Sequence, residues 1–163
     1  MNKSKKNHSF FASVYHAVVG FKDAFKREQN LRVHVCVANL ICFFAAFYGI
    51  SSVEWAILFL AIGLVVAAEL LNSAIEKAVD TATQEICTDA MHAKDFAAAA
   101  TLISAIIAVL VGIALFGNIR NISDALYRIF TTPYGLIILV ILIVIDLRLL
   151  FINIRKENGG KYE

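Results

Sequence analysis

Residues that interrupt helices are scarce in this sequence. One proline and 8 glycines occur among the 163 residues, and these are the residue types that most often break or end a helix. Their scarcity argues for long helices with little irregular structure between them. The 3 cysteines (Cys36, Cys42 and Cys87) include no pair with CxxC spacing, so we expect neither a disulfide framework nor a zinc site.

Charge is also scarce. Charged residues make up 17% of the chain and the formal net charge is +2, which is too little to indicate a nucleic-acid partner. A glycine-rich phosphate loop is lacking too, because Gly160–Lys161 has neither the upstream glycine nor the following Ser or Thr. Hydrophobic residues, in contrast, make up 60% of the chain, well above the average of soluble domains.

Four apolar runs are long enough to cross the hydrocarbon core of a bilayer. We place them at about residues 33–50, 53–76, 96–116 and 134–152. An amphipathic helix with a basic face is expected before them, over residues 10–25, and its pattern is typical of a helix that lies in the membrane interface. The fold predicted is an all-α integral membrane bundle, with residues 77–95 mostly helical and a short amphipathic connector at 117–133.

The distribution of Lys and Arg predicts the orientation of these spans. With four spans, the N-terminal segment, residues 77–95 and the tail fall on one side and carry thirteen of these cations, against two on the other side. Cytoplasmic segments carry the excess, so both termini and residues 77–95 are expected in the cytoplasm. Charges recur as far as Arg32 before the first long apolar run, which is unlike a signal peptide.

Polar residues interrupt the second apolar run at helical spacing. They share one stripe of the helix and are Glu69, Asn72, Ser73, Glu76 and Asp80. Ionisable groups at membrane depth are costly and usually face a bundle interior or a water-filled cleft. Two carboxylates and an amide on one stripe can serve a metal–phosphate site. The alternative is a polar seam that joins helices.

Three segments resemble the small bacterial integral-membrane diacylglycerol kinase/undecaprenol kinase family. They are GFKDAFKREQNLRVH (20–34), AELLNSAIEKAVD (68–80) and AKDFAAA (93–99). The resemblance covers about residues 10–117 and implies a homotrimer in the bacterial inner membrane. Each subunit would have an interfacial N-terminal helix and three spans, so residues 1–117 would form the lipid kinase unit. Residues 118–163 would add a connector, an extra fourth C-terminal span and a cytoplasmic tail.

The resemblance also implies an activity and its residues. The activity is transfer of the γ-phosphate of Mg-ATP to the hydroxyl of a lipid alcohol, either undecaprenol or diacylglycerol. Glu69 would be the general base, and Glu28 and Glu76 would hold Mg²⁺. The residues placed at the nucleotide and its metal would be Glu28, Asn72, Glu76, Glu85, Lys94 and Asp95. On the residues alone, Lys94 equally fits a charge that snorkels to the membrane surface, and Asp95 fits an anion in the first turn of a helix.

Some residues depart from the family pattern or leave alternatives open. His16 stands where some members have Tyr, Cys87 stands where some have His, and the fourth span is absent from the common form. Arg32 can steer phosphates or mark the interface. Within the fourth span, Asp146 is expected to pair with a polar partner in the bundle rather than take part in the chemistry.

Two functions other than a kinase are compatible with the composition. One is a small membrane transporter whose pathway the stripe lines, although the stripe ends in the cytoplasmic half and leaves no continuous polar path. The other is a non-catalytic membrane assembly protein in which the polar residues join helices.

Overall fold

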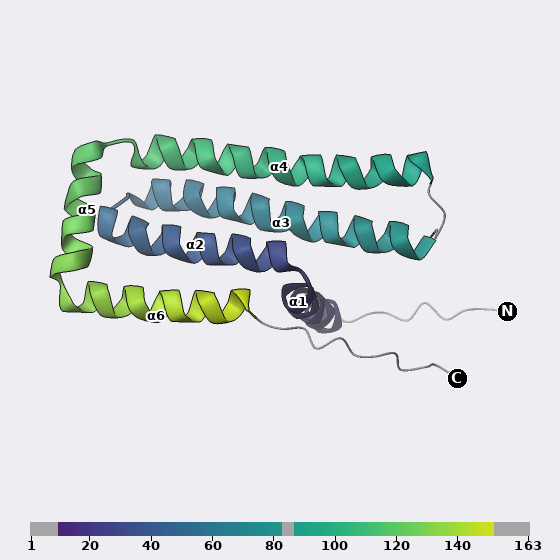
Figure 1. The fold of residues 1–163 in the computed structure, drawn as a ribbon, viewed down its shortest axis with the longest axis horizontal. Coiled ribbons are helices and arrows are strands. Elements are labelled where there is room, and N and C mark those ends of the chain that lie inside the picture. Colours follow the sequence, from purple (N-terminus) through teal and green to yellow (C-terminus); the bar gives the residue numbers. More distant parts are fainter. Residues whose placement is uncertain (1–9, 83–86, 152–163) are drawn as a thin grey trace.

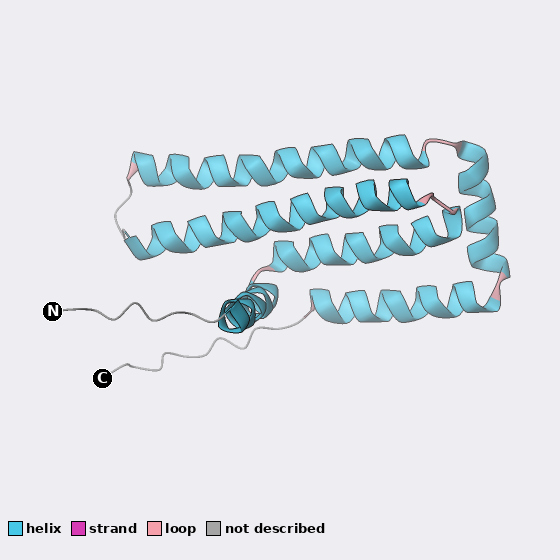
Figure 2. Ribbon diagram, turned by 180° about the vertical axis from the view of Figure 1, so that it is seen from behind, coloured by secondary structure: helices cyan, strands magenta, loops and turns pink. Residues whose placement is uncertain are grey.

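The computed structural model describes residues 10–82 and 87–151, and in these ranges the chain is built from helices without strands (Figures 1 and 2). The fold class predicted from the sequence is therefore confirmed. The helices, in chain order, are α1 (Phe10–Arg27), α2 (Gln29–Tyr48), α3 (Ser52–Ala82), α4 (Thr88–Phe116), α5 (Ile119–Thr131) and α6 (Pro133–Leu150).

Four of these helices have the length and hydropathy of membrane spans: α2, α3, α4 and α6. They run roughly parallel or antiparallel in the order α4, α3, α2, α6 (Figure 1). The most extensive packing is between α3 and α4, while α6 packs against α2. The two amphipathic helices lie across opposite ends of this layer, α1 at the end where α2 begins and α5 at the end where α4 finishes. The prediction of an amphipathic connector is confirmed by α5.

One helix boundary differs from the prediction, and one predicted helical segment is confirmed. The predicted ranges leave residues 26–32 between the amphipathic helix and the first span, but these residues do not form a separate connector, because α2 already begins at Gln29 and only Glu28 lies outside both helices. The prediction that residues 77–95 are mostly helical is confirmed where they are described, because α4 begins at Thr88 and α3 continues to Ala82, so that α3 has 31 residues and measures about 46 Å at 1.5 Å per residue. In both places the residues are polar but helix-compatible, so polarity marks where the helix leaves the membrane rather than where it ends.

Local signals fix the turns at the far end of the layer. Gly49 ends α2 in the left-handed region, with φ of 83° and its N–H donating to the Ala45 carbonyl at 3.0 Å. At the start of α3, the Glu54 carboxylate accepts from both the N–H and the hydroxyl of Ser51 at 2.7 Å. The bend between α2 and α3 is therefore a tight hairpin.

The corner between α5 and α6 depends on a close approach of the backbone. A Cβ atom on Gly135 would lie 2.5 Å from the carbonyl oxygen of Ile129 and 2.7 Å from the hydroxyl oxygen of Thr132. Pro133 stands in the first turn of α6, where its missing N–H costs nothing. This corner turns the chain back so that α6 returns along α2 (Figure 1).

Candidate active site at the junction of α1, α2 and α3

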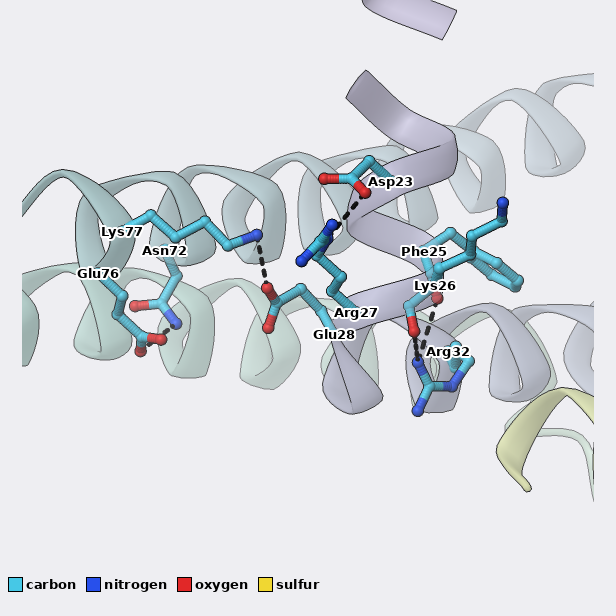
Figure 3. Close-up of polar contacts among 9 residues, drawn as sticks. All are labelled: Asp23, Phe25, Lys26, Arg27, Glu28, Arg32, Asn72, Glu76 and Lys77. Atoms are coloured by element: carbon cyan, nitrogen blue, oxygen red, sulfur yellow. Dashed lines mark hydrogen bonds and ion pairs between the residues drawn. The ribbon is translucent and has the colours of Figure 1, made fainter. Parts of the chain in front are cut away.

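Glu28 lies at the elbow between α1 and α2 and connects it to α3. Its backbone is extended (φ −95°, ψ 114°), and its half-buried carboxylate forms an ion pair with Lys77 at 2.9 Å. Figure 3 shows the Glu28 side chain directed at the turn of α3 that carries Glu76 and Lys77. The elbow therefore brings one predicted metal ligand beside the turn that supplies the other.

Arg32 anchors the end of α1 from inside the fold. It is only 4% exposed, and its Nη1 donates to the carbonyl oxygens of Phe25 at 3.2 Å and Lys26 at 2.8 Å (Figure 3). These carbonyls belong to the last turn of α1, where no helical N–H remains to pair with them. The sequence left two roles open for Arg32, steering phosphates or marking the membrane interface. The observed contact is a third one, because the guanidinium faces the backbone of α1.

The polar stripe of α3 passes from the buried part of the bundle to its surface. Glu69, Asn72 and Ser73 are buried, Glu76 is half-buried and Asp80 is exposed. Asn72 donates its Nδ2 to Glu76 Oε1 at 3.0 Å, within the same helix (Figure 3). No hydrogen bond from the Glu69 side chain to another described residue is present, so this residue does not join helices within the subunit. The spacing between Glu69 and Glu76 is about 10 Å along the helix axis.

Lys94 pairs with Asp80 in an ion pair that joins α4 to α3. Lys94 therefore contacts α3 further toward its C-terminal end than Glu28 does, and its partner there is the Asp80 carboxylate. Asp95 is exposed and makes no hydrogen bond or ion pair with the rest of the described chain. Glu85, which the resemblance places at the nucleotide, lies outside the described residues.

Two ionisable groups near the site have perturbed pKa values. The hydrogen bond from Arg27 at 2.8 Å lowers the pKa of Asp23 on α1. Backbone N–H groups of Ala90 and Asp89, in the first turn of α4, lower the pKa of the exposed Cys87 thiol. His16 is exposed on α1, and its ring lies against Tyr15 with 5.7 Å between the ring centroids.

The donor atoms at the junction suit a hard cation that keeps part of its hydration. Among the described residues there is no cluster of three or more His, Cys, Asp or Glu side chains, so a cage made only of protein ligands is not formed there. The amide oxygen of Asn72 is buried and has no hydrogen-bond partner among the described residues, and the nitrogen of the same amide donates to the Glu76 carboxylate at 3.0 Å. The Glu28 carboxylate contacts Lys77, the residue that follows Glu76. Mg²⁺ commonly takes one or two carboxylates and completes its shell with water and phosphate oxygens, and these residues fit that pattern.

A family model described as prokaryotic diacylglycerol kinase matches residues 15–116, from the second turn of α1 to the end of α4. The chain belongs to the prokaryotic diacylglycerol kinase family. As a member of this family it is a multi-pass membrane lipid kinase that uses a nucleotide co-substrate. Helices α5 and α6 lie beyond the part that the family model matches.

Relatives of this kinase family carry two different substrate names. The chain is 36% identical over 107 residues to the undecaprenol kinase of Bacillus subtilis, a match that covers 66% of this chain and 87% of that protein. It is also 36% identical over 104 residues to a diacylglycerol kinase of Helicobacter pylori, covering 64% of this chain and 81% of that protein. A diacylglycerol kinase of Synechocystis is 36% identical over 105 residues, covering 64% and 60%. No solved structure matches the chain.

Proposed function

We propose that this family member transfers the γ-phosphate of Mg-ATP to the hydroxyl of undecaprenol or diacylglycerol at the cytoplasmic face of the bacterial inner membrane. The observation that carries the proposal is the position of Glu69. It is 3% exposed, has no hydrogen-bond partner among the described residues, and lies two helical turns below Glu76. A carboxylate at this depth is placed to meet the hydroxyl of a lipid whose tail remains in the bilayer.

Each residue of the proposed site has one task. Glu69 accepts the proton of the lipid hydroxyl as general base, and Glu28 and Glu76 hold Mg²⁺ with the Asn72 oxygen beside them. When bound, the metal neutralises charge on the transferring phosphate. Lys94 and Asp95, together with Glu85, contact the nucleotide. This role requires Lys94 to exchange its Asp80 partner for phosphate oxygens.

The assembly and orientation belong to the same proposal. Residues 1–117 form the kinase unit of a homotrimer, an oligomeric state that rests on the family resemblance. Residues 118–163 add the extra span. The α1–α2 elbow, the C-terminal end of α3 and the N-terminal end of α4 lie toward the same end of the layer (Figure 1), which supports a common cytoplasmic side for these segments. Cysteine accessibility in intact cells and native mass spectrometry test the orientation and the subunit number.

The test of the reaction is phosphate transfer from labelled ATP in lipid nanodiscs that contain either undecaprenol or diacylglycerol. Glu69→Gln is expected to lower turnover by about 10²–10⁴-fold, the usual contribution of a general base. The variant is expected to fold, since Glu69 makes no hydrogen bond to another described residue that the amide would lose. Glu54→Gln is the matched control at the opposite end of α3, where a glutamine preserves the cap.

Two results would contradict the proposal. One is a wild-type protein that labels neither lipid at any Mg²⁺ concentration. The other is a Glu69→Gln variant with the turnover of the Glu54→Gln control.

A further inference from the structure

Helix α6 carries a buried carboxylate that the proposed reaction does not use. Asp146 is 5% exposed, and its Oδ1 accepts a hydrogen bond from Asn39 Nδ2 of α2 at 2.9 Å. The Cys36 thiol lies 3.6 Å from the Asp146 carbonyl oxygen and donates to it. The expectation that Asp146 pairs with a polar group of the bundle is thereby confirmed, and its partners identify the face of α2 against which α6 packs.

The same face of α2 carries Arg32. Arg32, Cys36 and Asn39 follow one another at spacings of four and three residues, which places them in one row along the helix. Arg32 lies one turn from Cys36, toward the elbow. Within the described ranges, the Nε of Arg32 and the Oδ2 of Asp146 are both buried and have no hydrogen-bond partner. A donor from a cation and an acceptor from an anion are thus left unpaired along one row of α2, which Arg32 begins and against which Asp146 packs at Cys36 and Asn39.

Charges at membrane depth are costly unless an opposite charge lies nearby, and in surroundings of low dielectric constant this attraction extends beyond contact distance. The other charged groups around Arg32 are engaged or face outward. Arg148, the other charged residue of α6, is exposed. On the described parts of α1, α2, α6 and the elbow, Asp23 is bonded to Arg27 and Glu28 to Lys77, which leaves Asp146 as the carboxylate that can balance Arg32.

We propose that Asp146 is a positioning residue of the kinase: it balances the buried Arg32 and thereby holds the α1–α2 elbow so that Glu28 lies beside α3. The chain of contacts runs from Asp146 through the shared row on α2 to Arg32, and from Arg32 to the carbonyls of Phe25 and Lys26. Glu28 follows those carbonyls directly. The extra span thus acts on the metal side of the site while remaining outside the part of the chain that the family model matches. The role of Glu28 as a metal ligand rests on the proposed function.

The experiment uses Asp146→Asn, which removes the charge while an amide oxygen can still accept from Asn39. Arg148→Gln is the matched control, because it removes an exposed charge from the same helix. The first readout needs no activity: hydrogen exchange of backbone amides, measured by mass spectrometry on the full-length protein in nanodiscs. Asp146→Asn is expected to accelerate exchange in peptides that cover residues 24–32 by about tenfold, which is less than the effect of breaking a buried salt bridge in direct contact. Peptides from the α3–α4 pair are expected to be unchanged.

The second readout is the dependence of turnover on Mg²⁺. The concentration of Mg²⁺ for half-maximal activity is expected to rise in Asp146→Asn by a factor of about five, which is less than one order of magnitude in apparent affinity. The KM for the lipid and the turnover at saturating Mg²⁺ are expected to stay at the values of the control. In an Arg32→Met background the same substitution should add no further increase in either readout.

These results separate the inference from the proposed function. A protein without kinase activity would refute the function, while the exchange measurement would still decide whether Asp146 holds the elbow. Unchanged exchange over residues 24–32 would refute the positioning role. So would an effect of Asp146→Asn that is undiminished when Arg32 is already absent, or an equal acceleration throughout all helices.

Discussion

The attachment of α1 to the rest of the chain offers the sharpest test of the fold around the site. None of the residues of α1 is buried, and its contacts are mainly with α2 and α3. The two hydrogen bonds from Arg32 Nη1 to the last turn of α1 are therefore a large part of what fixes this helix. We predict that Arg32→Met, which keeps the apolar stem but removes every donor, releases the C-terminal end of α1.

The size of the effect follows from the two bonds. A hydrogen bond to a charged group contributes about 1.5–3 kcal/mol. Because both bonds are only partly buried and start from one nitrogen, we take the low end for each, or about 3 kcal/mol together. Since about 1.4 kcal/mol corresponds to a factor of ten, amide exchange in α1 should accelerate by up to about 100-fold. The apolar face of α1 still binds the bilayer, so this value is an upper limit.

Hydrogen exchange by mass spectrometry in nanodiscs measures this change peptide by peptide. Arg27→Met is the matched control, because it removes an arginine of the same region whose ion pair with Asp23 at 2.8 Å is exposed. Such pairs contribute at most about 1 kcal/mol, so its effect should stay below about fivefold. The reasoning is refuted if the two variants behave alike, or if Arg32→Met accelerates exchange in α3 and α4 as much as in α1.

Three further predictions concern the metal, a helix corner and a thiol. Glu76→Gln should raise the Mg²⁺ concentration for half-maximal phosphate transfer by about tenfold or more, since even the loss of a hydrogen-bond partner of a metal ligand typically costs about 10–100-fold in metal affinity; an unchanged Mg²⁺ titration would remove Glu76 from the metal. Gly135→Ala should lower the melting temperature by several degrees, because its Cβ would lie 2.5 Å from the Ile129 carbonyl oxygen, whereas Gly112→Ala, with open space around it, should not; equal melting temperatures would contradict this. Cys87 should react first with maleimide, because its lowered pKa makes the thiolate available at lower pH than for an ordinary thiol; labelling that falls in step with a free cysteine as the pH decreases would contradict the predicted shift.

Much of the fold was predictable because membrane spans are set by long local patterns. The four apolar runs, the amphipathic segment before them and the amphipathic connector each correspond to one helix of the structure. The boundary at Glu28 was not predictable in the same way. Polar residues such as Gln29 and Asn30 mark the membrane surface, but they are compatible with a helix, so composition alone does not say that α2 already includes them.

The candidate site was predictable only where one helix carries it. The row from Glu69 to Glu76 follows from helical periodicity, and its graded burial agrees with that reading. The Glu28–Lys77 pair depends on how α1 and α2 pack on α3, which no spacing in the sequence encodes. Arg32 was seen as a charge near the interface, and only the packing of α1 reveals that its guanidinium faces backbone carbonyls. The roles of these residues in catalysis stay predictions.

The unequal lengths of the spans leave the ends of the helices at different heights on the side of the layer where α1 lies. Helix α2 has 20 residues and α6 has 18, whereas α3 has 31 and α4 has 29, so at 1.5 Å per residue the longer pair projects about 15 Å past the start of α2. Helix α1 lies at the end of the layer where α2 begins, beside the part of α3 and α4 that extends past it (Figure 1). If the proposed site is correct, a nucleotide from the water phase would bind against the projecting side of α3 and α4 without entering the hydrocarbon core, and the lipid hydroxyl would meet it at the depth of the headgroups.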